Sequence, residues 1–186
     1  MNVKSTPLNG VLIIEPDKFV DHRGFLLQVW HQQTYGNKGI TGTFVQDNHS
    51  RSYKNVIRGL HYQLRHPQGK FIFVVSGKIF DVAVDIRLGS PTFGQWFGAI
   101  LSDENHLQMF IPPGFAHGFC VLSETADLIY KCTDFYYPED QFGVNWADPG
   151  IGINWPVEGP ILSGKDSKLP FLKDIPRKNL PRFEEI

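Results

Sequence analysis

Short apolar runs alternate with turn-forming residues along most of the chain. The runs are rich in Val, Ile, Phe and Tyr, and clusters of Gly, Pro, Asn, Asp and Ser separate them. They span residues 10–14, 24–30, 42–49, 70–75, 78–86, 96–101, 106–112, 118–122 and 127–133. Segments of this length and spacing are typical of strands in an antiparallel sandwich or barrel. The pattern therefore predicts an all-β fold.

The stretch 70–86 contains two of these strands, and Ser76 and Gly77 between them predict a tight hairpin. In the second strand one face is apolar and is predicted to be core: Phe80, Val82, Val84 and Ile86. Asp81 and Asp85 fall on the other face.

Helical patterns are weak, and the best candidate for a short helix is residues 32–37. Prolines interrupt every regular pattern near the C-terminus, at positions 149, 156, 160, 170, 176 and 181. We therefore expect one domain over residues 1–186, with a core at about 10–150 and an arm at about 151–186 that wraps over the barrel.

Composition narrows the possible partners and the compartment. The chain has 18 Lys and Arg against 19 Asp and Glu, and a net charge of -1 argues against nonspecific binding of nucleic acid. No stretch resembles a membrane span or a signal-peptide core. Cys120 and Cys132 are too few for a disulfide framework and lack the spacing of a zinc site. A cytoplasmic protein is expected.

His61 lies within a strand-forming stretch, residues 55–64, where alternation puts it on one face with Gly59 and Gln63. A histidine that faces the inside of a narrow barrel beside a glycine indicates a pocket. A core histidine satisfied by a carbonyl or a carboxylate is the alternative.

A second histidine, His117, follows a Pro-Gly turn in residues 111–119, and P-x-G-x-x-H is half of the double motif of cupin barrels. In metal-binding cupins the other half is H-x-H followed by Glu. Here Gln63 replaces the second His and no Glu follows at the usual spacing. Two histidines make a poor site for a transition metal, so the sequence predicts no metal; a metal-dependent cupin oxygenase is kept as an alternative.

Several longer motifs resemble the dTDP-4-dehydrorhamnose 3,5-epimerase family, in order along the chain from about residue 10 to residue 172. They are residues 21–30, 44–63, 68–96, 111–119, 130–140 and 162–170. The resemblance implies a cupin-like antiparallel jelly-roll barrel with a few short helices and a C-terminal arm.

The resemblance also implies an isomerase that inverts C-3 and C-5 of dTDP-4-keto-6-deoxyglucose to give dTDP-4-keto-L-rhamnose, on the way to dTDP-L-rhamnose. Both carbons are α to the ketone, so a base can remove a proton to give an enolate and an acid can return one. No cofactor is expected.

Four residues match the family's catalytic groups. His61 matches the base, and Asp166 matches the carboxylate that orients its ring. Tyr130 matches the proton donor on the far face of the sugar, and Lys70 matches the cation that stabilises the enolate oxygen. By alternation, Asp81 or Asp85 is expected to hold the Lys70 ammonium.

Other positions match substrate contacts of the family. Arg23 and Arg58 match residues that bind the pyrophosphate, and Tyr136 matches the aromatic that stacks on thymine. Gln28 and Gln141 replace residues that are usually Glu, which affects nucleotide preference or affinity more than the reaction. The remaining expected contacts are Phe19, Gln46, Asp47, Asn48, His117 and Lys165.

Strict alternation puts Arg58 and His61 on opposite faces, so either a bulge intervenes or Arg58 reaches a pocket in a neighbouring subunit. The family forms homodimers by strand exchange, which would let Phe19 and Arg23 act in a partner's site. Two alternatives to the full epimerase stay open: an epimerase of C-3 or C-5 alone, or a ketoisomerase, and a catalytically silent sugar-nucleotide binder.

Overall fold

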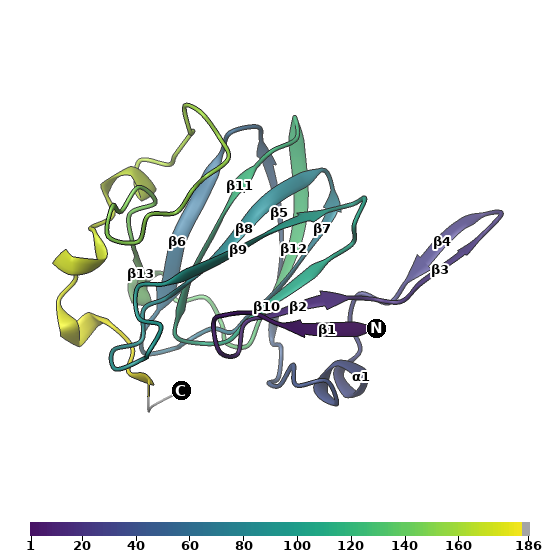
Figure 1. Cartoon of the computed structure of the whole chain (residues 1–186), viewed down its shortest axis with the longest axis horizontal. Coiled ribbons are helices and arrows are strands. Elements are labelled where there is room, and N and C mark those ends of the chain that lie inside the picture. Colours follow the sequence, from purple (N-terminus) through teal and green to yellow (C-terminus); the bar gives the residue numbers. More distant parts are fainter. Residues whose placement is uncertain (184–186) are drawn as a thin grey trace.

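Two facing antiparallel sheets form the body of the protein in a computed structural model that describes residues 1–183. The six-stranded sheet has the order β1-β2-β10-β7-β12-β5, and the five-stranded sheet has the order β13-β6-β11-β8-β9 (Figure 1). The predicted jelly-roll barrel is confirmed.

The strands are short and separated by turns, as the apolar pattern predicts. The six-stranded sheet comprises β1 (Asn2–Ser5), β2 (Leu12–Glu15), β5 (Gln46–Tyr53), β7 (Lys70–Ser76), β10 (Gln108–Ile111) and β12 (Thr125–Cys132). The five-stranded sheet comprises β6 (Ile57–Gln63), β8 (Lys78–Asp85), β9 (Trp96–Ser102), β11 (Phe115–Val121) and β13 (Gln141–Gly143). The expected short helix is α1 (Gln32–Gly36). Within residues 1–183, none of the helices reaches the length and apolarity of a membrane span.

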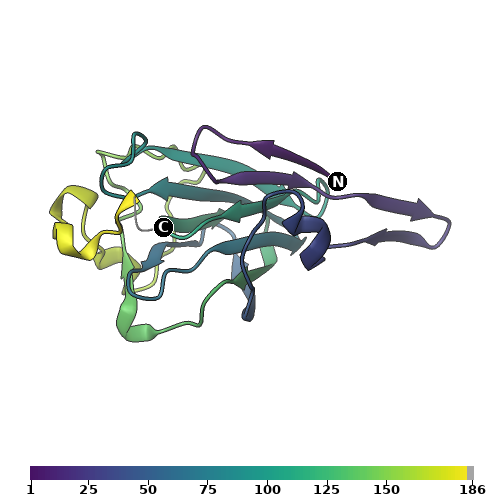
Figure 2. The ribbon, with the colours of Figure 1, turned by 90° about the horizontal axis from the view of Figure 1, so that it is seen from below.

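The stretch predicted as one strand at 24–30 contributes instead to a separate hairpin. Here β3 (Lys18–Asp21) pairs only with β4 (Gly24–Leu27), and this hairpin extends away from the barrel (Figure 1, Figure 2). Four of its apolar side chains are more than half exposed, namely Phe19, Val20, Phe25 and Leu26.

The predicted hairpin at Ser76 and Gly77 is wrong. β7 pairs with β10 and β12, whereas β8 pairs with β11 and β9, so the turn carries the chain from one sheet to the other. Gly77 has φ +83°, and a Cβ at this position would lie 2.2 Å from the Thr125 carbonyl oxygen. The glycine is needed for close approach at a corner between the sheets rather than for a two-residue hairpin loop.

Both faces of the five-stranded sheet are buried. Its inner face packs against the six-stranded sheet, with Ile79 and Ala83 in that cluster, while Val82 and Val84 pack on the outer face. The proline-rich C-terminal arm covers this outer face through Ile151, Leu172, Ile175 and Leu180. Three short 3₁₀ turns interrupt the arm: η2 (Asp166–Lys168), η3 (Leu172–Asp174) and η4 (Arg177–Asn179). The apolar face predicted for 80–86 is therefore buried beneath the arm, and Asp81 faces the barrel interior.

Candidate active site

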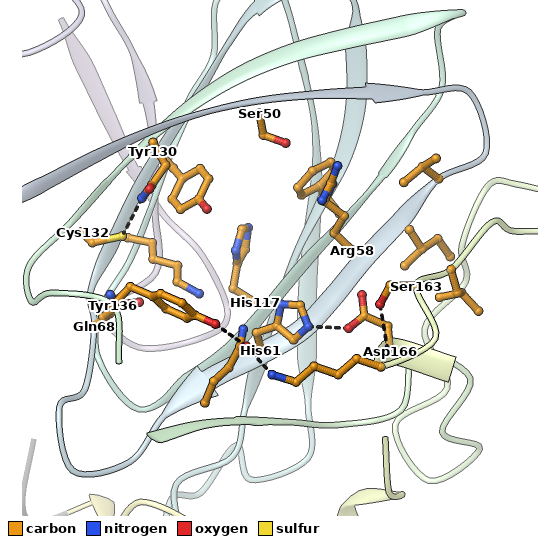
Figure 3. A pocket seen from close by; sticks show the side chains of 18 of the residues that line it. Ser50, Arg58, His61, Gln68, His117, Tyr130, Cys132, Tyr136, Ser163 and Asp166 are labelled. Carbon is orange, nitrogen blue, oxygen red and sulfur yellow. Dashed lines mark hydrogen bonds and ion pairs between the residues drawn. The ribbon is translucent and has the colours of Figure 1, made fainter. Parts of the chain in front are cut away.

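A cavity of about 610 Å³ opens between the two sheets, and the C-terminal arm closes one side of it (Figure 3). Its walls come from β5, β6, β7, β11, β12 and β13. The sequence-predicted residues that line it are Gln46, Asn48, Arg58, His61, Lys70, His117, Tyr130, Tyr136, Gln141, Lys165 and Asp166. The cavity therefore brings together residues from position 46 to position 166 of the chain.

His61 reaches the cavity because successive side chains of β6 point alternately to the outer face of the sheet, beneath the arm, and to the cavity. Leu60 and Tyr62 point outward and are buried beneath the arm, which leaves His61 directed inward. Its Nε2 lies 2.7 Å from Oδ1 of Asp166, which η2 carries in from the arm (Figure 3). A ring with one nitrogen on a carboxylate and the other side toward a cavity is arranged as a general base.

The Asp166 carboxylate is arranged to stay ionised. Burial opposes its charge, but the hydrogen bond from His61, the charge of His61 and the hydrogen bonds from Gly59 and Ser163 together lower the pKa of Asp166 below its usual range. The Gly59 N–H donates to Oδ2 at 3.4 Å. An ionised Asp166 orients the His61 ring and stabilises its protonated form.

The wall opposite His61 belongs to the other sheet and carries an acid and a cation. Tyr130 on β12 points its hydroxyl into the cavity, and burial, followed by the charge of Cys132, raises the pKa of this phenol (Figure 3). Lys70 on β7 lies across from Cys132 in the β12–β7 register. Burial lowers the pKa of the Lys70 ammonium, while Cys132 and Asp81 act in the opposite sense. The Tyr130 phenol and the Lys70 amino group therefore lie on the wall that faces the His61 ring.

A bulge brings Arg58 into the same cavity as His61. His117 lies opposite His61 and Phe119 lies opposite Arg58, so the one residue between these pairs on β11 faces two residues on β6. At the bulge, Gly59 has φ +112°, and a Cβ there would lie 2.6 Å from the His117 carbonyl oxygen. Of the two alternatives left open by the sequence, a bulge or a pocket in a neighbouring subunit, the structure has the bulge, and Arg58 lines the same cavity as His61. Arg58 Nε donates to Ser52 Oγ at 2.9 Å.

A second histidine–aspartate pair lies beside the first, because His117 on β11 is the register partner of His61 on β6. His117 Nε2 is 2.7 Å from Oδ1 of Asp81, and Asp81 is fully buried. Asp85 instead pairs with Arg87 at 2.7 Å, which leaves Asp81 as the carboxylate near Lys70.

The outer part of the cavity carries aromatic and amide groups. Tyr136 is 46% exposed, and its hydroxyl donates to Gln141 Oε1 at 3.0 Å. The Lys165 ammonium donates to the same oxygen at 2.5 Å. A flat ring beside an ammonium and amides suits a nucleobase and an adjoining phosphate.

Four predicted contacts do not line this cavity. Phe19 and Arg23 are on the projecting hairpin, where Arg23 pairs with Asp21 at 2.5 Å. Gln28 lies between β4 and α1, and its carbonyl accepts a bond from the Tyr35 hydroxyl. Asp47 points outward and binds Lys131 at 2.8 Å.

Several cavity residues were not predicted. Ser50, Gln68, Cys132 and Ser163 all line the cavity. Strand alternation could have found two of them, because Ser50 shares a face of β5 with Gln46 and Asn48, and Cys132 shares a face of β12 with Tyr130. The same rule predicts that Asp47 lies on the opposite face of β5, away from the cavity. Gln68 and Ser163 lie outside the strands, where alternation says nothing.

No group of three or more His, Cys, Asp or Glu side chains among residues 1–183 is arranged to hold a metal ion. Gln63, which occupies the place of a cupin metal ligand, directs its amide toward backbone groups of Phe135, His66 and Tyr137. The donor set that a cupin metal needs is therefore absent from the described residues.

Comparison with known proteins gives consistent matches over nearly the whole chain. The family model described as dTDP-4-dehydrorhamnose 3,5-epimerase matches residues 5–174. A protein of that name from Shigella flexneri is 52% identical over 168 residues, which cover 89% of this chain and 93% of that protein.

Solved structures agree with this match. A dTDP-6-deoxy-D-glucose-3,5-epimerase from Legionella pneumophila, in complex with dTDP-4-keto-L-rhamnose, is 52% identical with a TM-score of 0.95, and 98% of each chain is covered. A 3'-monoepimerase from Streptomyces bikiniensis in complex with dTDP-quinovose is 32% identical with a TM-score of 0.89, covering 97% of this chain and 94% of that one. The predicted resemblance and enzyme class, an isomerase, are confirmed: the chain belongs to the dTDP-4-dehydrorhamnose 3,5-epimerase family.

Proposed function

We propose that this protein epimerises C-3 and C-5 of dTDP-4-keto-6-deoxyglucose to give dTDP-4-keto-L-rhamnose, in the biosynthesis of dTDP-L-rhamnose. One observation carries the proposal: the His61–Asp166 pair and the Tyr130 hydroxyl extend from facing sheets into one cavity. Inversion of a carbon requires a base on one face of the sugar and an acid on the other, and a simple binding protein needs neither.

In this mechanism, His61 removes the proton from a carbon next to the C-4 ketone, and the electron pair of that C–H bond moves into the ring to form an enolate. The Lys70 ammonium stabilises the charge that develops on the C-4 oxygen. Tyr130 then donates its proton to the carbon from the opposite face, which regenerates the ketone with inverted configuration. His61 then releases its proton to solvent and Tyr130 regains one from solvent, so the same steps can be repeated at the second α-carbon, with no electrons gained or lost.

The electrostatics of the cavity support these roles. The lowered pKa of Asp166 favours an ionised carboxylate behind His61, and the raised pKa of Tyr130 favours a phenol that keeps its proton until the enolate forms. A buried phenol is a weak acid, yet an enolate carbon is a far stronger base.

The nucleotide is proposed to occupy the outer part of the cavity. Arg58 and Lys165 supply positive charge for the diphosphate, and Tyr136 supplies a surface for the base. Gln46, Asn48 and Gln141 offer amides around it, and His117 lines the inner part of the cavity. Because Asp166 and Lys165 come from the arm, the core at about 10–150 and the arm at about 151–186 are proposed to act as a single domain.

A homodimer with strand exchange is part of the proposal. The hairpin of β3 and β4 exposes Phe19, Val20, Phe25 and Leu26 to water, which is unfavourable unless a partner covers them. In such a dimer Phe19 and Arg23 would complete the partner's cavity. A cytoplasmic location is proposed as well, in keeping with the two buried free thiols of Cys120 and Cys132.

Mixing two impaired variants tests the exchange. If Arg23 acts in the partner's cavity, a mixture of Arg23→Ala and His61→Asn subunits contains hybrid dimers with one intact site, and about a quarter of the wild-type activity returns after random exchange. No recovery, in dimers that native mass spectrometry shows to have exchanged, would mean that Arg23 serves its own cavity.

A single-centre epimerase is the second candidate, because the Streptomyces bikiniensis 3'-monoepimerase shares the fold with a TM-score of 0.89. The deciding experiment follows deuterium from heavy water into dTDP-4-keto-6-deoxyglucose by NMR and mass spectrometry, with a chelator present. Label at both C-3 and C-5 supports the full epimerase, and label at one carbon supports the second candidate. No label at either carbon contradicts both and points to a silent binder or, if added metal restores activity, to a metal-dependent cupin.

A further inference from the structure

The loop that carries Tyr136 is held by four glutamines from separate parts of the chain. The loop comprises residues 134–137 and follows β12 at the mouth of the cavity. We name the four residues that hold it the glutamine clamp: Gln46, Gln63, Gln68 and Gln141. Every residue of the loop forms a hydrogen bond with at least one member of the clamp.

Gln63 is the central member and uses both ends of its amide. Its Oε1 accepts the backbone N–H of Tyr137 at 2.8 Å, and its Nε2 donates to the carbonyl oxygens of Phe135 at 3.1 Å and His66 at 2.7 Å. The side chain is 5% exposed and lies outside the residues that line the cavity. Gln63 therefore holds the backbone on both sides of Tyr136 without reaching the substrate.

The other three members hold the rest of the loop. Gln46 Oε1 accepts the N–H of Tyr136 at 2.9 Å, and Gln68 Nε2 donates to the Asp134 carbonyl at 2.9 Å. Gln141 Oε1 accepts a hydrogen bond from the Tyr136 hydroxyl at 3.0 Å. Gln141 and Gln63 are register partners on β13 and β6, so these two members of the clamp are fixed relative to each other by the five-stranded sheet.

An amide is the side chain that position 63 requires, because Gln63 is the member of the clamp that both accepts a hydrogen bond from the loop and donates one to it. The loop presents N–H donors and C=O acceptors together, and only a group with both a donor and an acceptor can satisfy the two. A carboxylate at position 63 would leave the carbonyls of Phe135 and His66 without this donor and would add negative charge near the site proposed for a diphosphate. Phe135 and Tyr136 are about half exposed, so little apolar packing fixes the loop.

We propose that Gln63, through the glutamine clamp, positions the Tyr136 ring in advance for the nucleobase and thereby sets nucleotide affinity. Gln63 is a positioning residue, since it acts through the backbone of residues 135–137. The inference rests on the proposed function, in which Tyr136 stacks on the base. A loop that is already ordered loses less conformational entropy when the nucleotide binds.

The test uses Gln63→Met, which keeps the length of the side chain and removes its hydrogen bonds without adding charge. We expect the Kd for dTDP, measured by calorimetry, and the KM for the sugar nucleotide to rise about tenfold, with kcat at saturation within about twofold of wild type. Gln63→Glu is expected to weaken binding further, because it cannot donate to the two carbonyls. An unchanged Kd for dTDP in Gln63→Met would overturn the proposal.

Gln108→Met is the matched control. Gln108 is also buried, accepts from the Tyr35 hydroxyl at 3.0 Å and donates to the Val29 carbonyl at 3.1 Å, and it is not among the residues that line the cavity. We expect this variant to lose thermal stability but to keep the wild-type Kd. An equal loss of affinity in Gln108→Met would show that any weakening of the fold lowers affinity, and would contradict a specific clamp.

A double-mutant cycle with Tyr136→Ala separates the clamp from the proposed function. If Gln63 acts through Tyr136, Gln63→Met has no further effect on the Kd once the ring is gone. A full tenfold effect without the ring overturns the clamp. If Tyr136→Ala alone leaves the Kd unchanged, the stacking role fails, and with it the link from the clamp to affinity.

If the stacking role fails, hydrogen exchange still tests whether Gln63 orders the loop. Faster exchange of the Tyr136 and Tyr137 amides in ligand-free Gln63→Met would still establish that Gln63 orders the loop. Unchanged exchange of both amides would contradict that ordering.

Discussion

Two histidine–aspartate pairs lie side by side in this cavity, and they differ in exposure and in the origin of the carboxylate. His61 and His117 are register partners on β6 and β11, and each has its Nε2 2.7 Å from an aspartate Oδ1. Asp166 reaches His61 from the C-terminal arm, whereas Asp81 comes from β8, the strand that neighbours His117.

The difference in burial separates their chemistry. The His61 side chain is 24% exposed and opens into the cavity, while His117 is 8% exposed and Asp81 is fully buried. Oδ2 of Asp81 is a buried atom without a hydrogen-bond partner among residues 1–183, whereas both oxygens of Asp166 accept hydrogen bonds. An open ring on a satisfied carboxylate can exchange protons with a substrate; a buried pair is better suited to hold its neighbours in place.

The largest expected effect compares the two rings directly. His61→Asn should lower the rate of α-proton exchange in heavy water by about a thousandfold, because the general base is removed. His117→Asn should change the rate at saturation by about tenfold or less and act mainly on KM. Equal losses of rate in the two variants, with dTDP binding retained in both, would refute the distinction.

The two carboxylates give the next comparison. Asp166→Asn should lower kcat on the order of a hundredfold, since the amide no longer stabilises the protonated His61 ring. Asp81→Asn should leave kcat at neutral pH within about threefold, because the amide oxygen still accepts a hydrogen bond from His117. Steady-state kinetics at saturating substrate measure both, and circular dichroism confirms that each variant is folded.

The alkaline limb of kcat/KM is expected to depend on Asp81 through Lys70. Burial lowers the pKa of Lys70 from 10.5, and the charge of Asp81 partly opposes this shift. The oxyanion role needs the protonated ammonium, so activity falls as pH rises through this lowered value. Asp81→Asn should move the limb to lower pH, and Lys70→Arg should move it to higher pH. If the alkaline fall in kcat/KM occurs at the same pH in both variants and in wild type, a group other than Lys70 is responsible for it.

The smallest effect concerns stability in acid. The pKa of Asp166 is lowered in the folded state, so the unfolded chain binds more protons at this residue as pH falls. Its stabilising contribution is complete above the unfolded pKa of about 3.9 and is lost as pH falls through the lowered folded value. From about pH 6 to about pH 3, the Tm of Asp166→Asn should therefore fall less than the Tm of wild type. An identical loss would mean that the arm carboxylate contributes nothing to acid stability.

Where sequence reasoning was wrong or incomplete, the cause was long-range structure or a local rule that was not applied. Ser76 and Gly77 have the composition of a hairpin turn, but the strands they join belong to different sheets, which no local pattern reports. Arg58 enters the cavity through a bulge that only the pairing of β6 with β11 creates. Asp47 was different, because alternation along β5 already turned it outward.

The residue pattern alone determined the short strands, the all-β class and the inward face of His61, because side chains of a strand alternate with a period of two wherever the strand is placed. The resemblance of the motifs supplied the family and the candidate roles. Only the tertiary structure decided which partners meet: Asp166 lies 105 positions from His61 in the chain and reaches it because apolar residues of the arm pack on the outer face of the five-stranded sheet. Such contacts depend on the burial of surfaces that are distant in sequence, and a local period carries no information about them.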